Sequence, residues 1–376
     1  MRIGIDARMM TPKASRGIGR YTEEMIRALL ALAPEHRYVL VTQHAIHAFS
    51  SHPSVETVVA NIPWYGVQEQ LRMPGVLRSL KADVIHVPHW NVPLLTHGDL
   101  VVTIHDLLLR HEPSSARVST RRPLVAAVKR IGFRATVFAT MHKANAILVP
   151  TDFVAEDIKR FYPFASKKIV VTGEGMGKHE RFAPHATDSR PPQSRYLLYI
   201  GSAYPHKGLD LLLDAWKDLE LQHPELRLKI AGAEDVFMRR LKDDVRHRKL
   251  PRIDFLDYVK EEDLYDLYRD AAAFVFPSRF EGFGLPPLEA IQAGCPVVCS
   301  DAAALPEVLG PDAAFFFQSG SRTDILRAIE TVLRDPVAAR EKTARALPSL
   351  RARHDWKATA ERTLAIYQSL PPWRHA

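Results

Sequence analysis

Two glutamates, Glu281 and Glu289, lie in a segment that combines glycines and prolines in an order suited to binding an anion. Residues 278–290 read Ser-Arg-Phe-Glu-Gly-Phe-Gly-Leu-Pro-Pro-Leu-Glu-Ala and follow an apolar run, Ala273–Phe276, that is typical of a buried strand. The glycines let the backbone approach a ligand closely, and the prolines suit the first turn of a helix. The N–H groups and partial positive charge at such a helix N-terminus attract phosphate. The segment therefore predicts a phosphate or diphosphate site that both glutamates can face.

The surrounding sequence alternates short apolar runs with helical spacing, which is the pattern of a parallel α/β sheet. In the first half, strands are predicted at residues 2–6, 38–42, 84–88, 100–105, 146–149 and 169–172. In the second half, they are predicted at residues 196–200, 227–231, 252–256, 273–276, 297–300 and 314–317. Helices are predicted over residues 18–32, directly after Lys207 and over residues 355–370. We therefore expect two doubly wound domains that bind ligands at the carboxyl ends of their strands.

The boundary between the two domains is predicted at residues 183–194, which contain three prolines and no apolar periodicity. This linker would separate a first domain, residues 1–182, from a second domain, residues 195–353. Residues 354–376 would form a helix that packs back toward the first domain. The length of 376 residues is that of two ordinary domains.

The composition excludes several other classes of protein. With 46% hydrophobic and 25% charged residues, the chain is neither disordered nor fibrous. The only two cysteines, Cys295 and Cys299, exclude a disulfide scaffold and a zinc site of four cysteines. The sequence has no run of about 18 apolar residues and no signal-peptide pattern. We therefore expect a cytoplasmic protein, soluble or peripheral at the inner face of the cytoplasmic membrane.

The positive charge of the chain is concentrated in its first half. The net charge is +8, and residues 1–190 hold 25 Lys and Arg against 16 Asp and Glu, which favours an anionic partner for that half. Residues 114–151 contain no acid and seven bases, which are Arg117, Arg121, Arg122, Lys129, Arg130, Arg134 and Lys143. Apolar residues are interleaved with these bases. Residues 117–143 therefore predict either a basic amphipathic helix on an anionic membrane surface or a solvated helix face.

The spacing of Glu281 and Glu289 resembles the Glu-x7-Glu motif of the retaining GT-B glycosyltransferases, and specifically of glycosyltransferase family 4. Further segments resemble that family in the same order, namely residues 16–21, 103–106, 149–153, 201–208 and 293–298. The resemblance covers nearly the whole chain. It implies a GT-B fold, which is an α/β architecture of two Rossmann-like, doubly wound domains that face each other across a cleft.

The resemblance also implies the activity and the residues that perform it. The chain would be a hexosyltransferase that uses a nucleotide-diphosphate sugar and retains the configuration at the anomeric carbon. Glu289 would bind the ribose, Glu281 the donor sugar, and Lys207 the diphosphate leaving group. His105 would lie against the donor sugar, so His105, Glu281 and Lys207 are the candidate catalytic residues. The other candidate donor-binding residues are Gly17, Gly19, Ser202, His206, Arg279, Gly282, Phe283, Gly284 and Leu285.

The phosphate-binding cations differ from the family pattern. Ser202 and His206 stand at positions where the family commonly has an arginine, so a second cation is absent, is His206, or is Arg279. Breaking a sugar–phosphate bond develops negative charge on the diphosphate, which a lysine and a helix N-terminus stabilise. The family is usually assigned an internal-return mechanism, so Glu281 is not expected to bond covalently to the sugar.

Other chemical motifs are missing from the sequence. No Asp-x-Asp and no His-Glu-x-x-His occurs, so we expect no metal and no cofactor besides the substrate nucleotide sugar. Residues 173–179 are not a P-loop, because Thr172 and His179 occupy its outer positions. Gly17 and Gly19 lack the third glycine of a dinucleotide fingerprint, which disfavours an oxidoreductase.

The donor and the acceptor are predicted from less specific signals. Residues 201–207 are similar to the phosphate loop of some mannosyltransferases, which favours GDP-mannose over UDP-glucose, UDP-GlcNAc or a dTDP-deoxyhexose. The basic first half favours a lipid-linked saccharide acceptor, as in the synthesis of lipopolysaccharide, other cell-surface polysaccharides or glycolipids. A basic nucleic-acid-binding protein is the non-enzyme alternative, but helix-turn-helix and aromatic RNA-binding signatures are missing.

Overall fold

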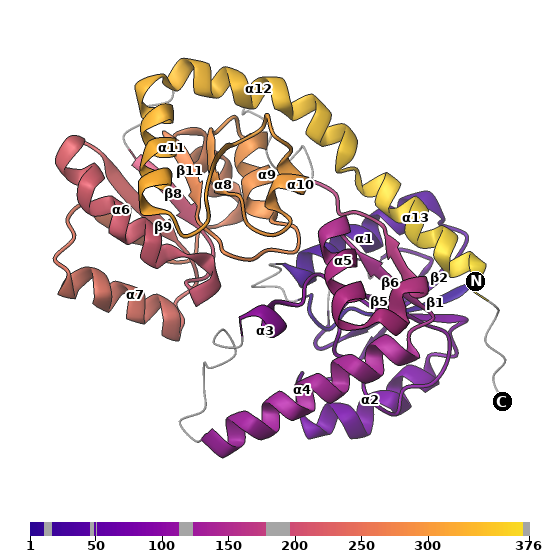
Figure 1. Cartoon of the computed structure of the whole chain (residues 1–376). Helices are drawn as coiled ribbons and strands as arrows, with labels where there is room; N and C mark the ends of the chain where they lie inside the picture. The colour runs from indigo at the N-terminus through magenta and orange to yellow at the C-terminus, as the bar shows by residue number, and fades with distance from the viewer. Residues whose placement is uncertain (11–16, 46–48, 50, 113–122, 178–195, 371–376) are drawn as a thin grey trace. The chain divides into compact units, whose positions relative to one another are not determined.

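The computed structural model describes residues 1–10, 17–45, 49, 51–112, 123–177 and 196–370 (Figure 1). The predicted linker, residues 183–194, and the bases Arg117, Arg121 and Arg122 lie outside the described residues. The chain divides into two compact units. The first unit comprises Met1–Leu107, Thr120–Gly175 and His354–Ala376, and the second comprises Leu108–Ser119 and Met176–Arg353.

Within the described residues, the first unit is built on a parallel sheet of seven strands. The strands are β1 (Arg2–Asp6), β2 (Arg37–Thr42), β3 (Val55–Val59), β4 (Val84–Val87), β5 (Leu100–Thr103), β6 (Ala146–Val149) and β7 (Ile169–Val171). Their order in the sheet is β3-β2-β1-β4-β5-β6-β7. The order reverses between β1 and β4, so the loops after these two strands meet at the switch point, where open α/β sheets bind ligands.

Helices cover both faces of this first sheet. They are α1 (Ile18–Leu32), α2 (Val67–Ser79), α4 (Pro123–Lys143), α5 (Asp152–Phe161), η2 (Pro163–Lys168) and α13 (Trp356–Ser369). One face packs against α1 and α13 through a buried cluster that includes Tyr21 and Tyr367. The other face packs against α2, α4 and α5 through a cluster that includes Met73 and Ile158. Helices on both faces bury the sheet, which explains why its strands read as continuous apolar runs.

The second unit repeats this design on a parallel sheet that has six strands among the described residues. The strands are β8 (Tyr196–Ile200), β9 (Arg227–Ala231), β10 (Ile253–Leu256), β11 (Ala273–Phe276), β12 (Val297–Ser300) and β13 (Phe315–Phe317), in the order β10-β9-β8-β11-β12-β13. Its helices are α3 (Leu108–His111), η4 (Pro205–Lys207), α6 (Leu209–Gln222), α7 (Val236–His247), α8 (Glu261–Arg269), α9 (Leu285–Gln292), α10 (Leu305–Leu309), α11 (Arg322–Arg334) and α12 (Pro336–Arg353). The switch point of this sheet lies between β8 and β11.

The two doubly wound parallel sheets confirm the fold class expected from the sequence, and the predicted strands end within two residues of the observed ones. The prediction for residues 100–105 is too long, because Ile104 and His105 lie beyond β5. The apolar pattern does not predict β3. This strand reads Val-Glu-Thr-Val-Val, lies at the edge of the sheet and is partly exposed, so it has no continuous apolar run.

Position 208 requires a glycine because of its backbone conformation and because of the atoms packed around it. Substitution of Gly208 should therefore lower the free energy of unfolding. Its φ is +69°, and a Cβ there would lie 2.0 Å from the carbonyl oxygen of Pro277. Gly294 has a similar φ of +73°, but a Cβ there would meet nothing within 4 Å. We expect Gly294→Ala to lower the stability by about 1–2 kcal/mol through its backbone alone. Gly208→Ala should lose a further ~1–3 kcal/mol through the clash. Urea unfolding measures both variants, and equal losses would contradict the close approach of Pro277.

Candidate active site

Lys207 is placed at the switch point of the second unit by the loop that follows β8. This loop ends in the short helix η4 and at Gly208, whose left-handed backbone precedes α6. The Nζ of Lys207 donates a hydrogen bond to Oε1 of Glu281 at 2.6 Å. Glu281 belongs to the loop that follows β11, so two residues separated by 74 positions meet where the strand order reverses.

Glu281 is held by more than this ion pair. The hydroxyl of the buried Ser278 donates to the same Oε1 at 2.6 Å. The main-chain N–H of Ala304 donates to the main-chain carbonyl of Glu281 at 3.2 Å. The Lys207 and Glu281 side chains are 18% and 14% exposed, so the pair is largely shielded from water. Short, charge-assisted hydrogen bonds of this kind fix the direction of the carboxylate.

Helix α9 begins directly after this loop, as the sequence predicts. Gly284 precedes the helix with φ +93°, and a Cβ there would lie 2.7 Å from Leu305. Pro286 and Pro287 occupy the first turn and carry no N–H, so they remove two of the donors that a helix N-terminus usually offers. The helix dipole is unaffected by the prolines and still favours an anion here.

Glu289 lies in the second turn of α9 and is 6% exposed. The hydroxyl of Tyr268, a fully buried residue of α8, donates to Oε2 of Glu289 at 3.1 Å. Glu289 is therefore oriented by α8, whereas Glu281 is oriented by the Lys207 loop. The two glutamates of the motif have different supports in the second unit.

His206 and Arg279 differ in the charge that they bring to the Lys207 loop. His206 is 6% exposed, and burial together with the neighbouring Lys207 ammonium lowers its pKa to about 4, so its imidazole is neutral at pH 7. The Arg279 guanidinium donates to a carboxylate oxygen of Asp210 at 2.5 Å and to the Pro205 carbonyl at 3.2 Å. Arg279 is thus the one of these two candidates that carries positive charge beside the loop.

The remaining candidates of the second unit lie on the same two loops. The hydroxyl of Tyr199 donates to the carbonyl of Ser202 at 2.7 Å, which ties the start of the loop to β8. Phe283 and the glycines beside it are buried, and Leu285 is the first residue of α9. The loops after β8 and β11 therefore carry Ser202, His206, Lys207, Arg279, Glu281, Gly282, Phe283 and Gly284, and Leu285 follows directly at the start of α9. In the described part of the chain, no group of three or more His, Cys, Asp or Glu is arranged to hold a metal ion.

Gly17 and Gly19 lie at the start of α1 in the first unit. Gly17 precedes the helix with φ +56°. A Cβ on Gly19 would lie 2.4 Å from the carbonyl oxygen of Met9, so α1 passes very close to the chain after β1. The backbone alone explains both glycines, and contact with a donor would be an additional role.

His105 lies just beyond β5 in the first unit, with 16% of its side chain exposed. Its Nε2 donates to the carbonyl of Pro88 at 3.2 Å, and the Tyr21 ring packs edge-on against the imidazole at 4.6 Å between centroids. Burial lowers the pKa of His105 to about 4, so the ring is neutral at pH 7 and its Nδ1 carries no proton. His105 can accept a hydrogen bond from a sugar hydroxyl at Nδ1 without adding charge.

Glu174 faces this histidine, although the sequence motifs did not select it. Its Oε2 lies 4.0 Å from Nδ1 of His105, which is too far for a direct hydrogen bond. Burial raises the pKa of Glu174 to about 8 against the opposing effect of Arg20, so its carboxyl group is protonated at pH 7. Glu174 belongs to a Gly-Glu-Gly run just after β7, and this place at the end of a strand is the signal that could have found it.

The two parallel doubly wound units have the architecture of the GT-B class. The family model described as Glycosyltransferase Family 4 matches residues 15–176, and the model described as Glycosyl transferases group 1 matches residues 183–349. The chain belongs to glycosyltransferase family 4. The resemblance that the Glu281–Glu289 spacing indicated is thereby confirmed.

Individual relatives and solved structures agree with this assignment. The chain is 28% identical to the O-antigen chain mannosyltransferase B of Escherichia coli, over 94% of this chain and 96% of that protein. Its fold is similar to that of sucrose-phosphate synthase from Thermosynechococcus elongatus, with a TM-score of 0.77, 19% identity and 98% of each chain covered. It is also similar to Anabaena HepE in complex with UDP-glucose, with a TM-score of 0.72, 16% identity and 98% and 100% of the two chains covered.

The protonated state of Glu174 predicts how the stability of the chain changes with pH. The native state keeps this proton up to about pH 8, whereas the unfolded chain releases it near the ordinary value of 4.5. The stability that Glu174 contributes is therefore full below 4.5 and is lost as the pH rises to 8. Glu174→Gln cannot ionise, so this variant should gain stability relative to the unmodified chain over that range. Urea unfolding at a series of pH values measures the gain.

Glu156→Gln serves as the control, because Glu156 is exposed on α5 of the same unit and pairs with the exposed Lys159. The free energy of unfolding of this variant should differ from that of the unmodified chain by the same amount at every pH between about 5 and 8. A similarly constant difference for Glu174→Gln would contradict a buried, protonated carboxyl group at this position.

Proposed function

We propose that this glycosyltransferase moves mannose from GDP-mannose to a lipid-linked saccharide in cell-surface polysaccharide synthesis, with retention at the anomeric carbon. The observation that carries the donor site is the Lys207–Glu281 pair at the switch point of the second unit. Mannose is supported by the O-antigen chain mannosyltransferase, which aligns with nearly the whole chain. A saccharide acceptor is supported by the same relative, and its linkage to a lipid is supported by the basic first half of the chain.

In the proposed reaction, the bond between the anomeric carbon and the donor phosphate breaks, and the nucleoside diphosphate leaves with the electron pair. The Lys207 ammonium and the dipole of α9 stabilise the negative charge that develops on it. The acceptor oxygen bonds to the anomeric carbon on the same face, and its proton moves to the departing phosphate oxygen. Glu281 holds a hydroxyl of the donor sugar, and its carboxylate is kept in place by Lys207 and Ser278.

UDP-glucose is the main alternative donor, because HepE was solved in complex with it. UDP-GlcNAc and a dTDP-deoxyhexose present the same diphosphate to Lys207 and are further alternatives. Since Lys207 and Arg279 supply positive charge beside this site, we propose that the reaction needs no metal ion with any of these donors.

The donor is tested by the melting temperature of the chain with GDP, UDP or dTDP in the presence of EDTA. We expect a rise that is selective for GDP, because only the nucleotide that binds the native state stabilises it. GDP-mannose should then be consumed in EDTA when a saccharide acceptor is present. Lys207→Met should lower kcat by about 100-fold or more, which is the usual effect of losing one group that stabilises transition-state charge.

Lys217→Met is the matched control for the lysine, because Lys217 is exposed on α6 of the same unit. This variant should keep both the rise in melting temperature that GDP causes and the kcat of the unmodified chain. A rise selective for UDP would reject mannose as the donor sugar. Full activity of the Lys207→Met variant would reject the role proposed for the ion pair.

We further propose that α4 lies against an anionic membrane surface. Ile131 and Phe138 are 69% and 54% exposed, and Arg134 is exposed on the same side of the helix. An adjacent side of the helix packs into the first unit through the buried Val137. An outer face that combines large apolar side chains with a base suits the interface of a bilayer. Among the described residues, none of the helices has the length and apolar composition needed to cross a bilayer.

The membrane contact is tested by sedimentation with vesicles that contain or lack phosphatidylglycerol. The unmodified chain should sediment with the anionic vesicles, and the double variant Ile131→Ser, Phe138→Ser should bind several-fold less. Val337→Ser removes an apolar side chain of equal exposure, 69%, from α12 and should bind normally. Equal amounts of unmodified chain in the supernatant with both kinds of vesicle would remove the proposal.

A further inference from the structure

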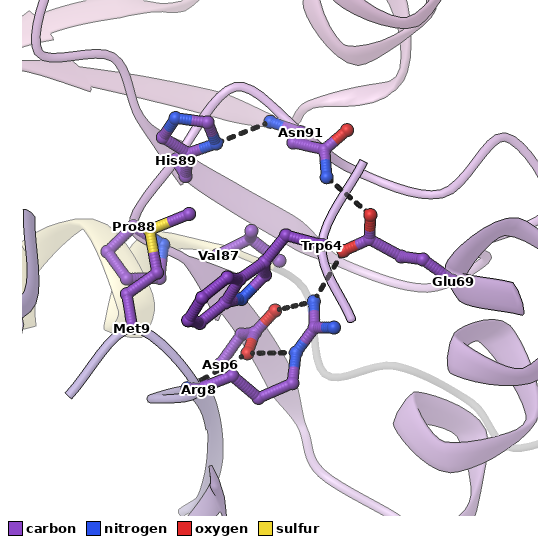
Figure 2. A pocket seen from close by; sticks show the side chains of 9 residues that line it. All are labelled: Asp6, Arg8, Met9, Trp64, Glu69, Val87, Pro88, His89 and Asn91. Carbon is purple, nitrogen blue, oxygen red and sulfur yellow. Dashed lines mark hydrogen bonds and ion pairs between the residues drawn. The ribbon is translucent and has the colours of Figure 1, made fainter. Parts of the chain in front are cut away.

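A small pocket lined by both polar and apolar residues lies at the switch point of the first unit (Figure 2). Asp6 and Arg8 reach it from the end of β1, and His89 and Asn91 reach it from the loop after β4. Its free volume is about 10 Å³, which is room for one water-sized group. The position is where doubly wound sheets bind ligands, and the size fits a single hydroxyl of a larger molecule.

Arg8, at the base of this pocket, is 1% exposed and bridges two carboxylates (Figure 2). Its Nη2 donates to Oδ2 of Asp6 and to Oε1 of Glu69, each at 2.7 Å. A buried group of three charges adds little net stability, because desolvation offsets much of their attraction. Its effect here is geometric, since it ties α2, which carries Glu69, to the end of β1.

The second oxygen of Glu69 fixes the rim of the pocket. Oε2 accepts hydrogen bonds from the main-chain N–H of Tyr65 at 2.7 Å and from the side-chain amide of Asn91 at 2.6 Å. The main-chain N–H of Asn91 in turn donates to Nδ1 of His89 at 3.1 Å. The segment before α2 and the segment after β4 are therefore held together by one buried carboxylate.

Tyr65 is the side chain that this rim presents to solvent. Its φ is +60°, a conformation that is rare for a residue with a bulky side chain, and it is 60% exposed. The ring stacks on Trp90, with centroids 5.4 Å apart and planes 29° apart, and its hydroxyl lies 3.4 Å from Nε2 of His89. A strained backbone that holds a large ring in water does little for the fold, and such outliers cluster at ligand sites.

We propose that Tyr65, backed by Trp90, and the adjoining pocket form a subsite for one pyranose ring of the saccharide acceptor. The C–H groups on one face of a pyranose are weakly positive and stack on the negative face of an aromatic ring. One hydroxyl of the same sugar enters the pocket, beside Asp6 and His89. This assignment rests on the proposed function, which supplies a saccharide acceptor.

The polar side chains at the pocket can form a hydrogen bond with one sugar hydroxyl. Burial lowers the pKa of His89 to about 3, so its imidazole is neutral. Because Nδ1 accepts the hydrogen bond from Asn91, the proton lies on Nε2. This Nε2 lies 3.4 Å from the Tyr65 hydroxyl and can exchange that long contact for a hydrogen bond to a sugar hydroxyl.

The test is an NMR titration of the full chain with the methyl glycosides of mannose, glucose, galactose and N-acetylglucosamine. At least one of them should bind the unmodified chain. Tyr65→Ala should weaken that binding by about tenfold, and Tyr65→Phe should retain it because the ring is kept. Tyr258→Ala removes a tyrosine of matching exposure, 59%, from the second unit and should leave the binding unchanged.

Failure of all four glycosides to bind, or equal binding by the Tyr65→Ala variant, overturns the subsite. Loss of sedimentation with anionic vesicles in that variant also overturns it, because the ring would then contact membrane. The nucleotide-induced rise in melting temperature and the hydrolysis of donor without acceptor report on the proposed function separately. Tyr65→Ala should leave both unchanged, so a failed subsite and a failed donor assignment give different results.

Discussion

The ion pair between Lys207 and Glu281 depends on how closely two loops of the second unit can approach each other. A Cβ on Gly208 would lie only 2.0 Å from the carbonyl oxygen of Pro277, so the backbones after β8 and β11 are in direct contact. This approach brings the Lys207 ammonium within 2.6 Å of the Glu281 carboxylate. The hydroxyl of Ser278, which lies on the same loop as Glu281, donates to the same carboxylate oxygen. A side chain at position 208 would push the loops apart and separate the charges. The glycine is thus a structural condition for the charged group proposed to stabilise the diphosphate.

The first unit differs in the electrostatics of its strand ends. Burial lowers the pKa of His89 to about 3 and that of His105 to about 4, and it raises that of Glu174 to about 8. These three groups are therefore neutral at pH 7. Arg8 is paired inside the unit with two carboxylates, so this buried group adds no positive charge that would attract a diphosphate. Neutral hydrogen-bonding groups suit sugar hydroxyls, whereas the paired lysine and glutamate of the second unit suit a diphosphate. This contrast agrees with the proposed division of donor and acceptor between the units.

Local sequence patterns predict most of the fold and the loop around Glu281. Strands buried on both faces give continuous apolar runs, and the determinants of α9 and its preceding loop lie within one short segment. The edge strand β3 is not predicted, because it is partly exposed. The contacts that organise the site are not predicted by these local patterns. Lys207 and Glu281 are 74 residues apart, and Arg8 and Glu69 are 61 apart. Such pairs meet only because of the strand order, which apolar periodicity does not specify.

The same reasoning explains why a donor site is easier to read from a sequence than an acceptor site. Every nucleotide-diphosphate sugar presents the same diphosphate, so a fixed run of glycines and prolines before one helix can serve many enzymes. Acceptor saccharides differ in their hydroxyls and linkages, so no fixed spacing can describe their contacts. In the proposed subsite, the buried group of Arg8, Asp6 and Glu69 fixes the backbone, and the exposed Tyr65 makes the contact. Because the support and the contact are different residues, the exposed one can change with the acceptor while the buried ones keep the loops in place.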